Sequence, residues 1–174
     1  MNTHLRPASL SISTRAAEGL DRRRWSVAEI EAMVEAGILL EDERFELIGG
    51  EIVPMSPKGV HHEVLKGHLN AYWMKRLPDR LMIIPETTFR ISTDTFLEPD
   101  FLFYPRSVGV RGISPATVLL AVEVADTSLS YDRGRKAKLY ASLGVPELWV
   151  IDAVKLVTRI FAGPAPDGAG LGSF

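Results

Sequence analysis

The chain has no cysteine among its 174 residues, which excludes disulfide bonds and cysteine-ligated zinc and is typical of a reducing compartment. It also lacks any apolar run of about 18 residues, the length that a membrane-spanning helix needs. Its N-terminus has no uninterrupted apolar stretch of the kind found in secretory signals. We therefore expect a cytoplasmic protein with no membrane partner.

The chain also lacks a large excess of either charge, because its 22 acidic and 20 basic residues give a net charge of only −2. Such a chain has no global attraction to nucleic acid. Any binding of DNA must depend on local basic clusters or on metal ions that neutralise phosphate charge. Hydrophobic residues make up 46% of the chain, which is enough for the core of one ordinary domain.

Both ends of the chain offer little that could pack. The first 17 residues contain no acid and several Ser, Thr and Arg, and the last 11 read PAPDGAGLGSF. We expect disordered tails over residues 1–20 and 164–174 and a single folded domain over 21–163.

Local signals define the first elements of that domain. Ser26 followed by Glu29 is a capping-box pattern, which predicts a helix that runs to about Ala36 and ends at Gly37. The segment RFELIGGEIVPM (44–55) alternates apolar and polar residues around two glycines, which predicts a hairpin with a two-residue turn.

The rest of the chain continues with strands and two more helices. Apolar spacing predicts a helix over about 60–77 and another over 132–143, opened by Asp132 and closed by Gly144. The expected strands lie within 81–92, 97–104, 117–125, 147–152 and 155–163, with a turn at STDT (92–95). This order predicts an α/β or α+β fold with a mixed, mostly antiparallel central sheet flanked by helices.

Two acidic residues interrupt apolar strands. Asp100 lies in LEPDFLFYP (97–105) and Glu123 in VLLAVEVADTS (118–128). If these strands pair around the loop 105–116, the two residues fall at or next to opposing positions. Two carboxylates so close in a dry sheet repel each other, and a divalent cation with oxygen ligands between them removes the repulsion. The alternative is that the Pro-Asp dipeptide is simply a turn or strand end and that Glu123 pairs with an arginine or faces water.

Further polar residues are spaced to join this pair. Glu46 lies between Phe45 and Leu47 and therefore on the opposite face of its strand. Asp132, Lys136 and Tyr140 follow each other at intervals of four and share one helix face. Arg133, Arg135 and Lys138 make the same stretch the most basic of the domain, although a solvated charged face has this composition too.

Three segments together resemble a known family. They are RFELIGGEIVPMSPKGVHH, EPD, and LLAVEVADTSLSYDRGRKAKLYASLGVPELWVID. In this order they are similar to the Uma-type restriction endonuclease family of the PD-(D/E)XK nuclease superfamily, over about 25–162. The resemblance implies the restriction-endonuclease-like fold and cleavage of DNA phosphodiester bonds with Mg²⁺ or Mn²⁺. Carried over by position, Glu46, Asp100 and Glu123 are the acids that hold the metal, and Lys136 is the lysine.

Other positions remain candidates at the same site. His62 occupies a place where the family tends to have a histidine, and His62, Arg133 and Tyr140 are candidates for substrate binding. Ala125 stands where the superfamily usually carries its lysine, so Lys136 would have to replace that lysine from the helix. A homodimer is compatible with the resemblance.

The sequence is therefore compatible with three functions. The first is a metal-dependent DNA endonuclease, and the second is a non-catalytic nucleic-acid-binding or regulatory module with the same fold. The third is a structural or interaction protein in which the acids pair with Arg133 or Arg135.

Overall fold

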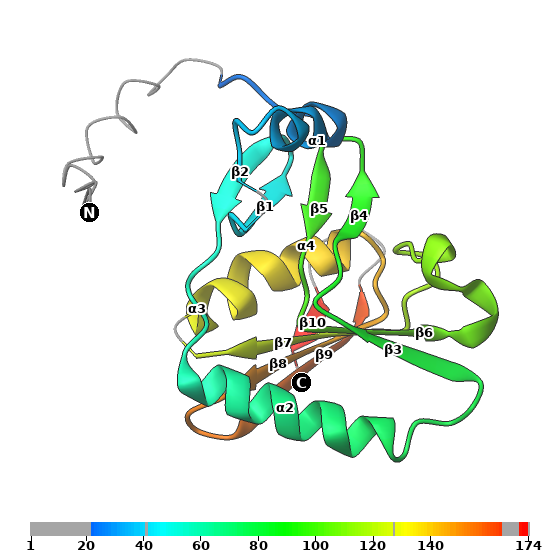
Figure 1. The fold of residues 1–174 in the computed structure, drawn as a ribbon. Coiled ribbons are helices and arrows are strands. Elements are labelled where there is room, and N and C mark those ends of the chain that lie inside the picture. Colours follow the sequence, from blue (N-terminus) through cyan, green and yellow to red (C-terminus); the bar gives the residue numbers. More distant parts are fainter. Residues whose placement is uncertain (1–21, 41, 127, 165–170, 174) are drawn as a thin grey trace.

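Two β-sheets and four α-helices form the structure, a computed structural model that describes residues 22–40, 42–126, 128–164 and 171–173 (Figure 1). The small sheet contains, in spatial order, β2 (Glu51–Pro54), β1 (Phe45–Ile48), β5 (Thr95–Leu97) and β4 (Phe89–Ser92). The large sheet contains β10 (Leu171–Ser173), β9 (Val157–Pro164), β8 (Glu147–Asp152), β7 (Leu120–Ala125), β6 (Phe101–Pro105) and β3 (Leu81–Pro85). All neighbours are antiparallel except β7 and β8, which confirms the mixed, mostly antiparallel arrangement.

The helices cover the sheets from different sides. They are α1 (Val27–Glu35), α2 (Val60–Met74), α3 (Leu129–Tyr131) and α4 (Ala137–Ser142), with a π-helical segment (Asp132–Lys136) joining the last two and two short 3₁₀ turns (Arg106–Val108 and Val110–Gly112) after β6. Figure 1 shows α1 against the small sheet, α2 on one face of the large sheet, and α3 with α4 on the other. No helix within the described residues is both long and apolar enough to cross a membrane.

The N-terminal signals are confirmed. Ser26 caps α1, its hydroxyl accepting the Glu29 backbone N–H while the Glu29 carboxylate accepts the Ser26 N–H. The helix ends at Glu35 with Ala36 as its C-cap, and Gly37 follows with a φ of 67°. Ile30 on its buried face packs with Leu47 of the small sheet, so α1 and the hairpin share one core.

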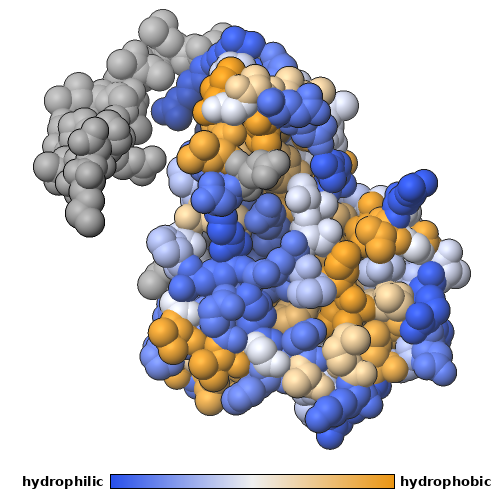
Figure 2. Space-filling model, viewed as in Figure 1, coloured by the Kyte–Doolittle hydropathy of each residue, from blue (hydrophilic) through white to orange (hydrophobic). Residues whose placement is uncertain are grey.

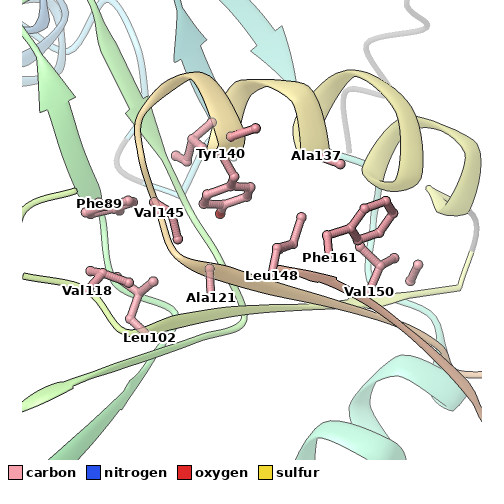
Figure 3. Close-up of a cluster of buried hydrophobic side chains, with 13 residues drawn as sticks. Phe89, Leu102, Val118, Ala121, Ala137, Tyr140, Val145, Leu148, Val150 and Phe161 are labelled. Atoms are coloured by element: carbon pink, nitrogen blue, oxygen red, sulfur yellow. The ribbon is translucent and has the colours of Figure 1, made fainter. Parts of the chain in front are cut away.

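The large sheet has an apolar core on each face because its side chains alternate. Figure 3 shows the core beneath α4, where Tyr140 and Ala137 lie over Leu148 and Ala121. On the opposite face, Trp73 of α2 meets other strand residues, with ring centroids 5.0 Å from those of Phe101 and Phe103.

The predicted strand 97–104 is wrong as a single element. β5 ends at Leu97 in the small sheet, and β6 begins at Phe101 in the large sheet. Pro99 lies between them, and a proline has no N–H to donate to a sheet ladder. The predicted strand 81–92 divides in the same way into β3 and β4, around Glu86, whose φ is 48°. The chain thus passes between the sheets at both of these places.

Other boundaries differ from expectation. The helix predicted over 132–143 begins at Leu129, so Asp132 lies inside it, although Gly144 ends it as predicted with a φ of 74°. The expected disorder of residues 1–20 lies outside the described residues. At the other end, Leu171–Ser173 pairs with β9, a strand that the sequence analysis did not predict.

Candidate active site

A pocket of about 310 Å³ lies at the junction of the two sheets and gathers most of the acidic residues that the sequence singled out. Figure 2 shows hydrophilic side chains concentrated in the band between the small sheet and α2. The charged residues that line the pocket and are at most 6% exposed are Glu46 of β1, Asp100, Glu123 of β7, and Asp132 and Lys136 of the π-helical segment. Groups this deeply buried must satisfy one another.

The strand register explains why Asp100 and Glu123 meet. β6 pairs with β7 so that Phe101 is opposite Val122, and continuing this register by one residue places Asp100 opposite Glu123, as the sequence predicted. Asp100 is fixed there because its Oδ2 accepts a hydrogen bond of 2.7 Å from the Val124 backbone N–H.

Lys136 joins the two sheets through their carboxylates. Its Nζ lies 2.8 Å from Glu46 Oε1 and 2.9 Å from Glu123 Oε1. Glu46 Oε1 also accepts the Glu98 backbone N–H at 3.0 Å. Burial disfavours the charge on Lys136, but the Glu123 and Glu46 carboxylates outweigh it and hold its pKa above the ordinary value. The charged form of Lys136 is therefore favoured within an acidic pocket.

Glu123 experiences the opposite balance. Burial raises its pKa to about 8, Lys136 counteracts the shift, and the carboxylates of Asp132, Asp100 and Glu46 add to it. Tyr140 donates a hydrogen bond of 2.7 Å from its hydroxyl to Glu123 Oε1. Because Tyr140 is fully buried, the structure does not support a role for this residue in substrate binding. Its hydroxyl instead fixes the orientation of the Glu123 side chain.

The π-helical segment gives Asp132 and Lys136 their shared direction. Both side chains point inward, from a segment with the wider turn that often occurs at functional sites. Asp132 Oδ2 accepts a hydrogen bond of 2.5 Å from the Ser128 hydroxyl, and burial raises the pKa of Asp132. The sequence showed the shared face but gave no sign of Ser128.

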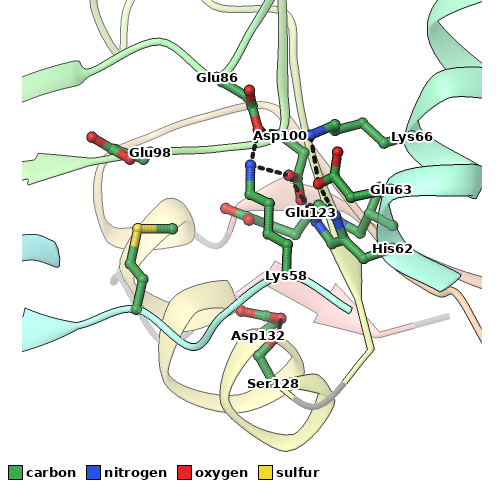
Figure 4. Close-up of polar contacts among 12 residues, drawn as sticks. Lys58, His62, Glu63, Lys66, Glu86, Glu98, Asp100, Glu123, Ser128 and Asp132 are labelled. Atoms are coloured by element: carbon green, nitrogen blue, oxygen red, sulfur yellow. Dashed lines mark hydrogen bonds and ion pairs between the residues drawn. The ribbon is translucent and has the colours of Figure 1, made fainter. Parts of the chain in front are cut away.

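His62 and Lys58 approach the pocket from the side of α2 (Figure 4). His62 is buried, with Nε2 2.9 Å from Asp100 Oδ1 and Nδ1 3.1 Å from Glu63 Oε1. Lys58 Nζ lies 3.9 Å from the same Asp100 oxygen. Sequence reasoning missed Lys58, and the only signal was its position four residues before His62.

The other basic residues of the helical stretch, Arg133, Arg135 and Lys138, lie outside the pocket. Arg133 does not line the pocket, and its buried Nε has no hydrogen-bond partner in the part of the chain that the structure describes, so its assignment to substrate binding gains no support. Lys138 is exposed, as expected from its place on the helix.

The pocket suits a hard divalent cation that needs few protein ligands. Six carboxylic residues line it against the ammonium groups of Lys136 and Lys58 and the guanidinium of Arg44, so acidic groups outnumber basic ones. Within the described ranges no three His, Cys, Asp or Glu side chains are grouped to enclose a metal ion, and a closed zinc-type cage is not formed. Mg²⁺ usually takes one or two carboxylates and completes its shell with water and phosphate, and Asp100 and Glu123 fit that requirement.

The fold, with a mixed sheet flanked by helices and acidic residues at its strand ends, is restriction-endonuclease-like. The family model for Uma2, described as "Putative restriction endonuclease", matches residues 28–168. The chain belongs to this family. Among curated proteins no match was found.

A solved structure supports the fold. The chain is similar to the crystal structure of a "putative nuclease belonging to DUF820" from Anabaena variabilis ATCC 29413, with a TM-score of 0.57 and 15% sequence identity. The similarity covers 81% of this chain and 93% of that one.

Proposed function

We propose that this protein is a metal-dependent endonuclease that hydrolyses phosphodiester bonds of DNA in the pocket between its two sheets. The observation that carries the proposal is the position of Lys136, whose ammonium group contacts Glu46 and Glu123 beside Asp100. Ala125 offers no cation on β7, and the helix supplies one at the same carboxylates.

Each residue has a distinct part in this proposal. Asp100 and Glu123 hold Mg²⁺ or Mn²⁺, which when bound adds positive charge at the phosphate and makes a bound water more acidic. Lys136 places a second positive charge where negative charge develops on the phosphate. Glu46, which the resemblance also assigns to the metal, binds Lys136 in this structure and fixes its position.

The neighbours keep these groups in place. His62 holds Asp100 from the side of α2, and Tyr140 holds Glu123 from the side of α4. Because the charged groups are almost fully buried, their interactions are less screened than they would be in water. A preorganised site of this kind spends no free energy on reorientation during the reaction.

The test is cleavage of a supercoiled plasmid by the purified protein with Mg²⁺ or Mn²⁺. We expect nicked and linear products that disappear with EDTA and in Asp100→Asn, which keeps the shape of the side chain but loses its charge. Asp79→Asn changes an exposed aspartate and should cleave like the wild type. If the wild type cleaves neither double-stranded nor single-stranded DNA with either metal, the endonuclease proposal is wrong and a non-catalytic binding module becomes the better interpretation.

A further inference from the structure

Six ionisable side chains form a closed ring beside the pocket, and the proposed chemistry uses only two of them. In order around the ring they are Asp100, His62, Glu63, Lys66, Glu86 and Lys58, and each pairs with the next and the last with the first. Figure 4 shows Lys58 extended between Glu86 and Asp100, with Lys66 approaching from α2. The ring connects α2, the loop before it and the end of β3.

Glu86 is the point where two cations converge. Its Oε1 lies 2.7 Å from Lys66 Nζ and also pairs with Lys58 Nζ. The two lysine side chains are only 14% and 17% exposed, whereas that of Glu86 is 44% exposed. Two largely buried lysine side chains thus pair with one oxygen of a partly exposed glutamate.

The two lysines are costly to hold together. Burial lowers the pKa of Lys58 to about 8, and although Asp100 opposes this shift, the charges of Arg44 and Lys66 add to it. An anion with several oxygens, such as a phosphate group, would satisfy both lysines better than a single carboxylate oxygen. The pair therefore has the character of a phosphate site.

Glu86 itself is strained. Its φ of 48° lies in the left-handed region, which is unfavourable for a residue with a long side chain. The backbone is held there by the Glu86 N–H, which donates to the Asp100 carbonyl at 3.2 Å. Strain of this kind tends to persist at functional positions, and here it places a carboxylate in front of the two lysines.

We propose that Lys58 and Lys66 bind a phosphate of the substrate strand next to the one that is cleaved, and that Glu86 occupies the place of that phosphate in the free protein. The inference rests on the proposed endonuclease function. Lys58 lies 3.9 Å from Asp100, so a phosphate held by Lys58 neighbours one held at the metal-binding acids. Binding then exchanges the Glu86 carboxylate for phosphate oxygens.

The test measures the affinity for a fluorescently labelled single-stranded oligonucleotide by anisotropy. EDTA prevents cleavage, and a pH of about 7 keeps Lys58 protonated. We expect Lys58→Ala and Lys66→Ala each to weaken binding by about fivefold and to reduce the slope of log K against log salt by about 0.7. Lys75→Ala removes an exposed lysine at the other end of α2 and should change neither value.

The direction in which DNA affinity changes when Glu86 is replaced tests the proposal most sharply, because removing a competing carboxylate should strengthen binding. We expect Glu86→Gln to tighten binding by about threefold, a gain that disappears when Lys58 and Lys66 are also replaced. Glu86→Gly tests the same point with a residue that tolerates the backbone conformation. If either Glu86 variant binds DNA like the wild type or more weakly, the ring is only structural and the proposal is overturned.

The outcomes also separate this inference from the proposed function. A wild type that binds through the two lysines but never cleaves would contradict the endonuclease and leave the phosphate site standing. An enzyme that cleaves DNA, but whose DNA binding is unchanged in the lysine variants, would support the endonuclease and contradict the phosphate site. A protein that neither binds nor cleaves DNA would contradict both. Inorganic phosphate serves as the second ligand: thermal stabilisation by phosphate that depends on both lysines, without an effect of these variants on DNA binding, would assign the site to a free anion and overturn the proposal.

Discussion

Two buried glutamates share one lysine at the centre of this site, and its properties follow from their mutual charge. Without Lys136, the carboxylates of Glu46 and Glu123 would repel each other when both are charged. Water would screen this repulsion little, because both side chains are nearly inaccessible to it. Removing one partner of a buried ion pair leaves the remaining charge without compensation. Lys136 therefore contributes to folding as well as to the proposed chemistry.

Replacing this lysine tests both of its roles. Lys136→Ala should abolish cleavage and lower the free energy of unfolding by about 3–5 kcal/mol, the usual cost of breaking a buried ion pair. Urea denaturation followed by circular dichroism measures the second effect. Lys138→Ala is the matched control, since it removes an exposed lysine two residues away, and should change stability by less than about 0.5 kcal/mol. Equal stability of the two variants would show that Lys136 is not buried between the glutamates.

The sequence predicted the centre of the site better than its periphery. The four-residue spacing of Asp132, Lys136 and Tyr140 was enough to place them on one face, and strand pairing was enough to bring Asp100 to Glu123. Lys58, Lys66 and Glu86 could not be found in this way. They come from separate elements, and their meeting depends on how α2 lies against β3 rather than on any local pattern.

At the scale of single elements, three of the predicted cap residues marked boundaries because their signals are local, whereas Asp132, predicted to open a helix, lies inside it. Ser26, Gly37 and Gly144 act through their own backbone neighbours. The passage of the chain between sheets was not predictable from hydrophobicity, since β5 and β6 read as one apolar run with a short interruption at Glu98, Pro99 and Asp100. The π-helical segment is equally invisible, because its extra residue per turn barely alters the apolar spacing.

The Gly49–Gly50 turn allows a matched test at this scale. Both glycines have positive φ, 57° and 80°, and asparagine tolerates this conformation better than most residues. A Cβ at Gly50 would lie 2.6 Å from the Arg24 Cβ, whereas one at Gly49 has no neighbour within 4 Å. Gly50→Asn should therefore lower the free energy of unfolding by about 1–3 kcal/mol.

The control for this prediction is Gly49→Asn, which makes the same substitution one residue earlier and should cost less than about 1 kcal/mol. Both variants are compared with the wild type by urea denaturation. A larger loss for Gly49→Asn would mean that the hairpin does not pack against residues 24–25 in the way that the structure shows.

For the whole molecule, the site is also the junction between its two sheets. Glu46 belongs to the small sheet, Glu123 lies on β7 of the large sheet, and Asp100 directly precedes β6. Lys136 contacts both Glu46 and Glu123 and so connects the two sheets. The chain passes between the sheets at Glu98–Asp100, directly beside these acids. A ligand bound at the junction should consequently stabilise the folded molecule as a unit.

Binding of a divalent metal should therefore raise the melting temperature of the whole domain. A ligand at 100 times its dissociation constant stabilises a folded protein by about 2.7 kcal/mol, which for a chain of this size corresponds to about 5–10 °C. We expect Mn²⁺ to produce such a shift in the wild type and in Glu51→Gln, which changes an exposed carboxylate on β2. Asp100→Asn should lose the shift, because it removes one of the two proposed metal-binding carboxylates. An undiminished shift in Asp100→Asn would place the metal elsewhere on the protein, even if the wild type cleaves DNA.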